Sequence, residues 1–169
     1  AAVNLATETA AHILELLDEG KSFSREMAKT ATLHKTPLGF FKRLVVEKSG
    51  EHKNKLNLKL TGLTPLVDAV RTLALDQKVF ETNTIDRISA LVEKESLAPA
   101  DADDLRDAFN VIMLTRVRHH VNVLRQGGVP DNYVNPDELS IIQRTMLKEA
   151  FKAIDRLQGL LELRYDIKA

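Results

Sequence analysis

The residues best suited to chemistry in this sequence form the run TRVRHH at positions 115–120. At about 100° per residue in a helix, Arg116 falls on the same face as the apolar residues of this segment, whereas Arg118 points nearly the other way. An unpaired charge on a core-facing stripe costs several kcal/mol, so Arg116 needs an anion. Either a carboxylate of the chain or an anionic ligand supplies it, and of the two we expect an open cleft for a ligand. The acids available for an internal salt bridge are Asp68, Asp86 and Asp131.

Two histidines, His119 and His120, flank Arg116 on the expected helix. A histidine on a helix is more often a structural group than a ligand, and neighbouring histidines lie about 100° apart, which makes a shared metal difficult. A ribonuclease site built from Arg and His is a third interpretation. However, the gap from Arg116 to either histidine is shorter than in the helical toxin ribonucleases. We therefore expect no metal ligand and no ribonuclease site here.

Two polar strings carry a structural and a functional interpretation side by side. In PDNYVNP, at 130–136, Asp131 and Asn132 either hydrogen-bond their own backbone, as turn residues do, or face a ligand. In ETNTIDR, at 81–87, the polar residues either cap a helix or hold a phosphate at its N-terminus. The residues concerned in the second string are Asn83, Thr84 and Arg87. The turn and the cap are the simpler interpretations.

Motifs of common enzyme classes are absent from the sequence. It contains no G-x-G-x-x-G, no Walker A motif, no H-E-x-x-H and no G-x-S-x-G. Asp101 and Asp103 have the spacing of a magnesium site, but they open a helix, where acids stabilise the positive end of the helix dipole. We expect no catalytic residue, no metal ligand and no cofactor in this chain.

The apolar residues predict an all-α bundle of about six helices. An irregular or short hairpin segment is expected near 43–60, with Leu56 and Leu58 alternating inward, and Phe40 and Phe41 are expected to anchor the core. Pro65 is expected at the first position of its helix, and Ser140 with Gln143 forms a capping box. The expected helices are 7–19, 22–32, 64–76, 84–96, 99–126 and 140–165.

Composition limits the functional classes. The chain has 169 residues, 24 basic against 24 acidic residues and no Cys. A net charge of zero speaks against DNA as a partner, although residues 21–59 are basic and residues 81–107 acidic. The length suits one domain, no apolar run is long enough for a membrane span, and the missing Cys fits the cytoplasm. A start at Ala without an export signal suggests a piece excised from a longer protein.

Several strings, taken in order, resemble the putative nucleotidyltransferase substrate-binding domain of bacterial signalling proteins. They are LGFFKRLVVEKSGEHKNKLNLKLTGLTPLVDAVRTLAL at 38–75, ETNTIDRI, RVRHHV, PDNYVNPDELS and LKEAFKAIDRLQ. The resemblance spans roughly 37–158, and we assign 37–169 to this helical bundle. The N-terminal helices of 1–36 are expected to belong to the same single domain. The polar positions that the resemblance implies for substrate binding are Lys59, Asn83, Thr84, Arg87, Arg116, Arg118, His119, Asp131 and Asn132.

The resemblance also implies a setting. Such proteins carry an N-terminal nucleotidyltransferase domain similar to that of PII uridylyltransferases, which binds Mg²⁺ and a nucleoside triphosphate, and a CBS pair or a cyclic-nucleotide-binding domain. The function implied for this chain is non-catalytic recognition of a nucleotide or an acceptor protein. The alternative is a dimerisation or signal-relay module without a ligand pocket, in which the helix 140–165 forms a homodimer.

Overall fold

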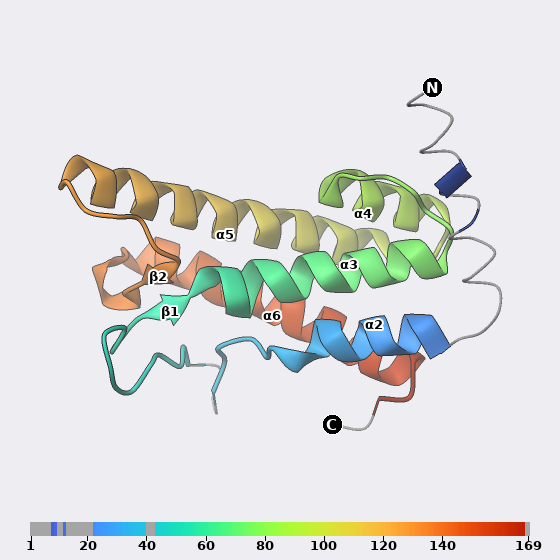
Figure 1. Cartoon of the computed structure of the whole chain (residues 1–169), viewed down its shortest axis with the longest axis horizontal. Helices are drawn as coiled ribbons and strands as arrows, with labels where there is room; N and C mark the ends of the chain where they lie inside the picture. The colour runs from blue at the N-terminus through green and yellow to red at the C-terminus, as the bar shows by residue number, and fades with distance from the viewer. Residues whose placement is uncertain (1–7, 10–11, 13–21, 40–42, 168–169) are drawn as a thin grey trace.

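The computed structural model describes residues 8–9, 12, 22–39 and 43–167, and this part of the chain is mainly helical (Figure 1). The predicted all-α class is confirmed, with five α-helices and one very small sheet among the described residues. Of the predicted helix 7–19 only residues 8–9 and 12 are described, and these are helical. The predicted core anchors Phe40 and Phe41 lie outside the described residues. In chain order the elements are α2 (Ser22–Leu33), β1 (Leu56–Asn57), the π-helix η2 (Lys59–Leu63), α3 (Thr64–Asp76), α4 (Thr84–Glu93), α5 (Pro99–Arg125), β2 (Tyr133–Val134), the 3-10 helix η3 (Pro136–Glu138) and α6 (Ile141–Arg164).

Local signals set the helix ends, as predicted. At α4 the Asn83 side chain accepts a hydrogen bond from the Ile85 N–H at 2.8 Å. At α6 the capping box forms with both of its hydrogen bonds, because Ser140 and Gln143 each accept the other's backbone N–H. After α5 the backbone turns at Gly127, whose φ is +75°. The ends of α3, α5 and α6 therefore agree with the prediction to within about one residue.

The helix α3 begins at Thr64 with Pro65 in its first turn, as predicted. This start is not a free helix end, however, because η2 leads directly into α3 and the Thr64 N–H donates to the Lys59 carbonyl five residues back. Proline has no N–H, and in a regular α-helix its ring clashes with the carbonyl four residues earlier. The wider π turn carries the helical backbone past Pro65 without that clash.

The hydrophobic core lies between α2, α3, α5 and α6, with α4 against α3 and α5 (Figure 1). The predicted apolar stripe of α3 is buried, and Leu66 and Leu73 are fully enclosed. Ile112 of α5 and Phe151 of α6 are equally buried and meet at Gly62, where an added Cβ would lie 3.1 and 3.2 Å from their side chains. None of the described helices has both the length and the apolarity needed to cross a membrane.

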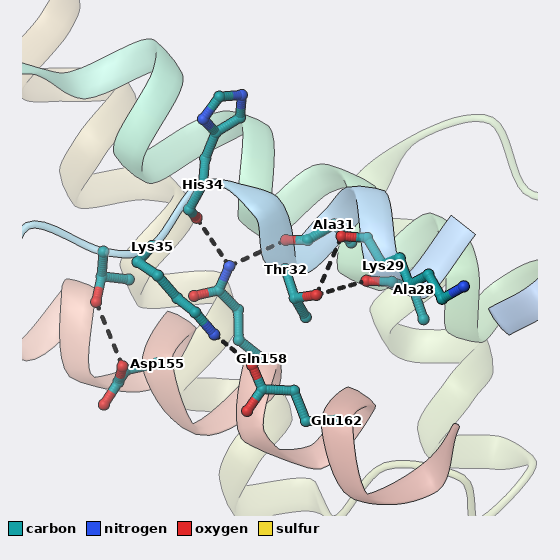
Figure 2. A network of polar contacts seen from close by, with 10 residues as sticks. Ala28, Lys29, Ala31, Thr32, His34, Lys35, Asp155, Gln158 and Glu162 are labelled. Carbon is teal, nitrogen blue, oxygen red and sulfur yellow. Dashed lines mark hydrogen bonds and ion pairs between the residues drawn. The ribbon is translucent and has the colours of Figure 1, made fainter. Parts of the chain in front are cut away.

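A buried glutamine joins the end of α2 to α6, as Figure 2 shows. Gln158 is 2% exposed, and its side-chain amide donates to the carbonyls of Ala31 and His34, each at 2.9 Å. The last carbonyls of a helix have no partner within the helix, and burial keeps water away from them. The Gln158 amide is the hydrogen-bond donor that these carbonyls need. An ion pair of Lys35 with Glu162 lies beside it.

The segment 43–60 is irregular, which is one of the two forms predicted, and hydrogen bonds of Glu47 with Asn54 and Lys55 close a turn within it. The strand β1 at its end pairs outside the segment, which was not predicted. Leu56 pairs with Val134 and Asn57 with Tyr133 in antiparallel register, so the partner strand comes from the loop after α5. Leu56 and Leu58 do point inward, as predicted, and both are buried. Burying them leaves backbone groups that need hydrogen-bond partners, which the loop of β2 provides. As a result, the chain before α3 is tied to the chain after α5.

Candidate functional site

A cluster of polar side chains lies where the C-terminal half of α5 meets the loop that leads into β2. Arg116, His119 and His120 are three and four residues apart, so they share one face of α5, and each is half-buried. The loop returns from the end of α5 and places Asp131 and Asn132 opposite this face. In Figure 1 the end of α5, both strands and the start of α6 lie together at one end of the bundle.

Asp131 is the centre of this cluster. Its Oδ1 accepts the Tyr133 backbone N–H at 2.9 Å and lies 2.9 Å from the His119 Nε2. Its backbone carbonyl lies 2.7 Å from the His120 Nε2. A carbonyl oxygen can only accept, so His120 carries its proton on Nε2. Asp131 thus makes the predicted bond to its own backbone and also joins the loop to α5.

Competing effects act on the Asp131 carboxyl. Partial burial alone would raise its pKa, but the Tyr133 N–H, the hydrogen bond and charge of His119 and the nearby charge of Lys55 together lower the pKa below its usual value. Asp131 is therefore an ionised acceptor at neutral pH, and His119 is its donor.

Arg116 has a neutral partner instead of a carboxylate. Its Nε donates to the Asn132 Oδ1 at 2.7 Å. Within the described residues its two terminal nitrogens make no hydrogen bond and no ion pair. Of the acids considered as partners, Asp68 pairs with Arg71 at 2.8 Å, and Asp131 is bonded to His119. Among the described residues Arg116 forms no ion pair with Asp68, Asp86 or Asp131, so the internal salt bridge that we considered is wrong. The Arg116 guanidinium is held in place by a neutral amide, which does not neutralise its charge.

Two aromatic rings close the other side of the cluster. The rings of His52 and Tyr133 stack with centroids 3.5 Å apart and planes 5° apart. The His52 Nδ1 is buried, has no hydrogen-bond partner among the described residues and lies 3.9 Å from the Asp131 Oδ2. The segment before β1 is thereby held against the same loop that contacts α5.

Sequence reasoning missed His52 and Tyr133. Tyr133 carried a weak signal, because it is the one aromatic residue among the turn formers of its loop. His52 lies in the polar string SGEHKNK and carried none, because its partner is 81 residues away in the chain.

The other predicted site residues lie apart from this cluster. Arg118 is exposed on the opposite face of α5, as its helical angle predicted. Lys59 is exposed at the start of η2, next to Leu58, whose N–H donates to the Asn132 carbonyl at 2.9 Å. Lys59 is therefore close to the cluster in the chain, although no contact joins it to those side chains in the described structure.

The predicted residues of the string ETNTIDR belong to the start of α4, which lies at the far end of the bundle from β1 and β2 (Figure 1). Asn83 is the N-cap and Thr84 is the first helical residue. The Arg87 Nε donates to the Glu81 carbonyl at 2.6 Å, and burial and the nearby charge of Arg71 lower the pKa of Arg87. These contacts are those of a helix cap, and the structure does not bring these residues to Asp131.

Taken together, a helical bundle with cationic and amide side chains gathered at one end has the make-up of a binding module. The model of the family "putative nucleotidyltransferase substrate binding domain" matches residues 21–165. The match covers most of the chain, which therefore belongs to this family. Comparisons with curated proteins and with solved structures gave no match. A substrate-binding domain of this kind implies a catalytic partner domain.

Proposed function

We propose that this chain recognises the phosphate groups of a nucleotide, or an acidic surface of the acceptor protein, through the cluster around Arg116. The observation that carries the proposal is the hydrogen bond from Arg116 to the neutral amide of Asn132. It fixes the guanidinium at Nε and leaves both terminal nitrogens available. Two parallel donors from one guanidinium match a phosphate or carboxylate oxygen pair.

The surroundings favour an anion over a cation at this position. The only acid bonded within the cluster, as far as the structure describes it, is Asp131, and its carboxylate already faces His119 and the Tyr133 N–H. Lys55 lies close enough to act on the Asp131 charge, and Lys59 begins η2, two residues after the end of β1. A second positive charge at this end of the bundle would raise the local affinity for an anion.

The catalytic partner domain supplies the chemistry in this proposal. We infer that it belongs to a bacterial, cytoplasmic signalling protein of the PII-uridylyltransferase type with a CBS or cyclic-nucleotide-binding module. In that protein Mg²⁺ and the nucleoside triphosphate are held by the catalytic domain. The present chain then adds the Arg116 guanidinium from the side, which aligns the nucleotide or the acceptor without taking part in bond making.

Isothermal titration of the full-length protein with ATP and UTP in the presence of Mg²⁺ tests this proposal. The chain alone should bind weakly or not at all, whereas the full-length protein should bind, and Arg116→Met should weaken that binding about tenfold. If the acceptor is the ligand, the same variant should instead raise the KM for the acceptor protein. Metal-dependent nucleotidyl transfer by this chain alone would contradict the proposal.

Arg118→Met is the matched control, because Arg118 lies two residues away on the exposed face of the same helix. An equal loss with Arg118→Met would mean that total charge matters and that the position of Arg116 does not. The unfolding free energy provides a second control. Arg116→Met leaves no carboxylate without its partner, so it should lower the unfolding free energy by only about 1 kcal/mol. A cost of roughly 3 kcal/mol or more would indicate a buried ion pair instead.

A further inference from the structure

The solvent face of α5 carries an apolar stripe that the proposed function does not use. Leu114 is 49% exposed, Val117 48%, Val121 40% and Leu124 59%. Their spacings of three, four and three residues place them along one side of the helix, the side turned away from the core. We call these four residues the α5 stripe. Single exposed apolar residues are common, but a row of four on one helix is typical of an interaction surface.

A groove between α5 and α6 meets the α5 stripe at Leu114. It has a volume of about 470 Å³, and Leu114 and Met146 stand on its two sides. Its lining includes the small residues Ala108, Ala150 and Ala153, which let another backbone approach closely. The stripe and the groove together offer a ridge and a hollow next to each other, as two packed helices require.

The charge on α5 changes sign along its length. Residues 99–110 carry four acids and one Arg, a net charge of −3, whereas residues 111–125 carry three Arg and no acid, a net charge of +3. The α5 stripe lies in the positive half and begins near the change of sign. On the same side of the helix, exposed Asp107 precedes the stripe and exposed Arg125 follows it. Asp103 and Asp104 pair with Arg106 and Arg156, so Asp107 is the acid that gives this face its negative end. A partner of uniform charge would be attracted at one end of this face and repelled at the other.

We infer that the occupant of this face is a second copy of the chain, packed with its α5 antiparallel to the first. A two-fold axis places the negative half of each α5 against the positive half of the other, which matches charge at both ends. With the axis near Arg116, Asp107 and Arg125 lie nine residues to either side, about 13 Å along the helix. Asp107 then faces the partner subunit's Arg125, and the two stripes meet in the middle.

This interface differs in part from the one expected from the sequence, because α5 forms its centre and helix 140–165 contributes only the side that lines the groove. It also leaves the cluster around Asp131 free, because Arg116 and His119 lie on the core-facing side of α5. Dimerisation and ligand binding are therefore separable, and a failure of either proposal leaves the other standing.

Sedimentation equilibrium of the chain over a wide range of concentrations provides the first test. The unaltered chain should show a reversible monomer–dimer equilibrium. Leu114→Lys should raise the dimer dissociation constant about a hundredfold, because it puts two positive charges into the centre of the interface, at the level of the exposed Arg118. Leu163→Lys is the control: Leu163 is 87% exposed near the end of α6, so this variant should leave the dimer unchanged. A strict monomer at every concentration, or a dimer that Leu114→Lys does not weaken, overturns the proposal.

Charge exchange tests the antiparallel arrangement. Asp107→Lys and Arg125→Glu should each weaken the dimer about tenfold, since each creates two contacts between like charges. A 1:1 mixture of the two variants should regain the affinity of the unaltered chain, because every contact in the mixed dimer is then between opposite charges. The double variant should regain it as well. If neither the mixture nor the double variant recovers, the antiparallel pairing is wrong and the proposal falls.

Discussion

Replacing Asp131 with Ala should loosen the junction between α5 and the loop of β2, because this carboxylate joins the two. The variant removes an acceptor from the Tyr133 N–H and from the His119 ring, both at 2.9 Å. A buried hydrogen bond to a charged group contributes about 1.5 to 3 kcal/mol, but 39% of the Asp131 side chain is exposed, so water replaces part of what is lost. We expect a loss of about 2 kcal/mol in unfolding free energy, or roughly 4 to 8 °C in melting temperature.

Urea unfolding of the chain at pH 7, followed by far-ultraviolet circular dichroism, measures this loss. Asp137→Ala is the matched control, because Asp137 is 79% exposed and its ion pair with Arg144, at 3.3 Å, lies at the surface. The control should cost less than about 0.5 kcal/mol. If Asp131→Ala costs no more than the control, the carboxylate does not hold the loop to α5, and the account of the cluster is wrong.

The same variant predicts a dependence on pH. The pKa of Asp131 is lower in the folded chain than in the unfolded chain, where an Asp titrates near about 3.9. A group with a lowered pKa contributes its stability fully above the unfolded value and loses it as the pH falls through the folded value. The difference between the unaltered chain and Asp131→Ala should therefore stay constant from pH 7 to about pH 5 and shrink below about pH 4. A difference that stays constant in acid would contradict the lowered pKa.

Two further predictions concern the core. Gln158→Ala should lower the unfolding free energy measured in urea by about 2 to 3 kcal/mol, because two carbonyls at the end of α2 lose their donor and the buried site is left partly empty. The control is Gln143→Ala, on the half-buried first turn of α6. A similar cost for both variants would show that water replaces the buried amide. Gly62→Ala should lower the unfolding free energy by about 1 to 3 kcal/mol, since the new methyl group would press on Ile112 and Phe151. A more stable variant would mean that the helix gains more from Ala than the core loses.

The helices were predictable because the signals that end them are local. Pro99 at the start of α5, Gly127 after it and the Ser140 capping box all act within about four residues, so the surrounding sequence is enough to place them. Pro65 was the exception. Its place near a helix start was predicted, but the π turn before it was not, because the turn also depends on how Gly62 packs against two other helices.

The candidate site was predictable in part. Arg116 stood out because it interrupts an apolar stripe, and that property is visible in the sequence. Its partner was not visible: the acids considered were Asp68, Asp86 and Asp131, whereas the structure places the amide of Asn132 against it. Whether Asp131 or Asn132 faces Arg116 depends on the path of the loop after α5. A shift of one residue in that path would turn the other side chain toward Arg116.

The sequence by itself determined the all-α class, most of the helix bounds and the family, because apolar spacing, caps and matching strings are properties of neighbouring residues. Tertiary structure alone decided which distant segments meet. The pairing of Leu56 with Val134 and the stacking of His52 on Tyr133 join residues about 80 positions apart. The physical reason is that such contacts depend on how α3, α4 and α5 pack and bring the two loops together, so no local preference specifies them.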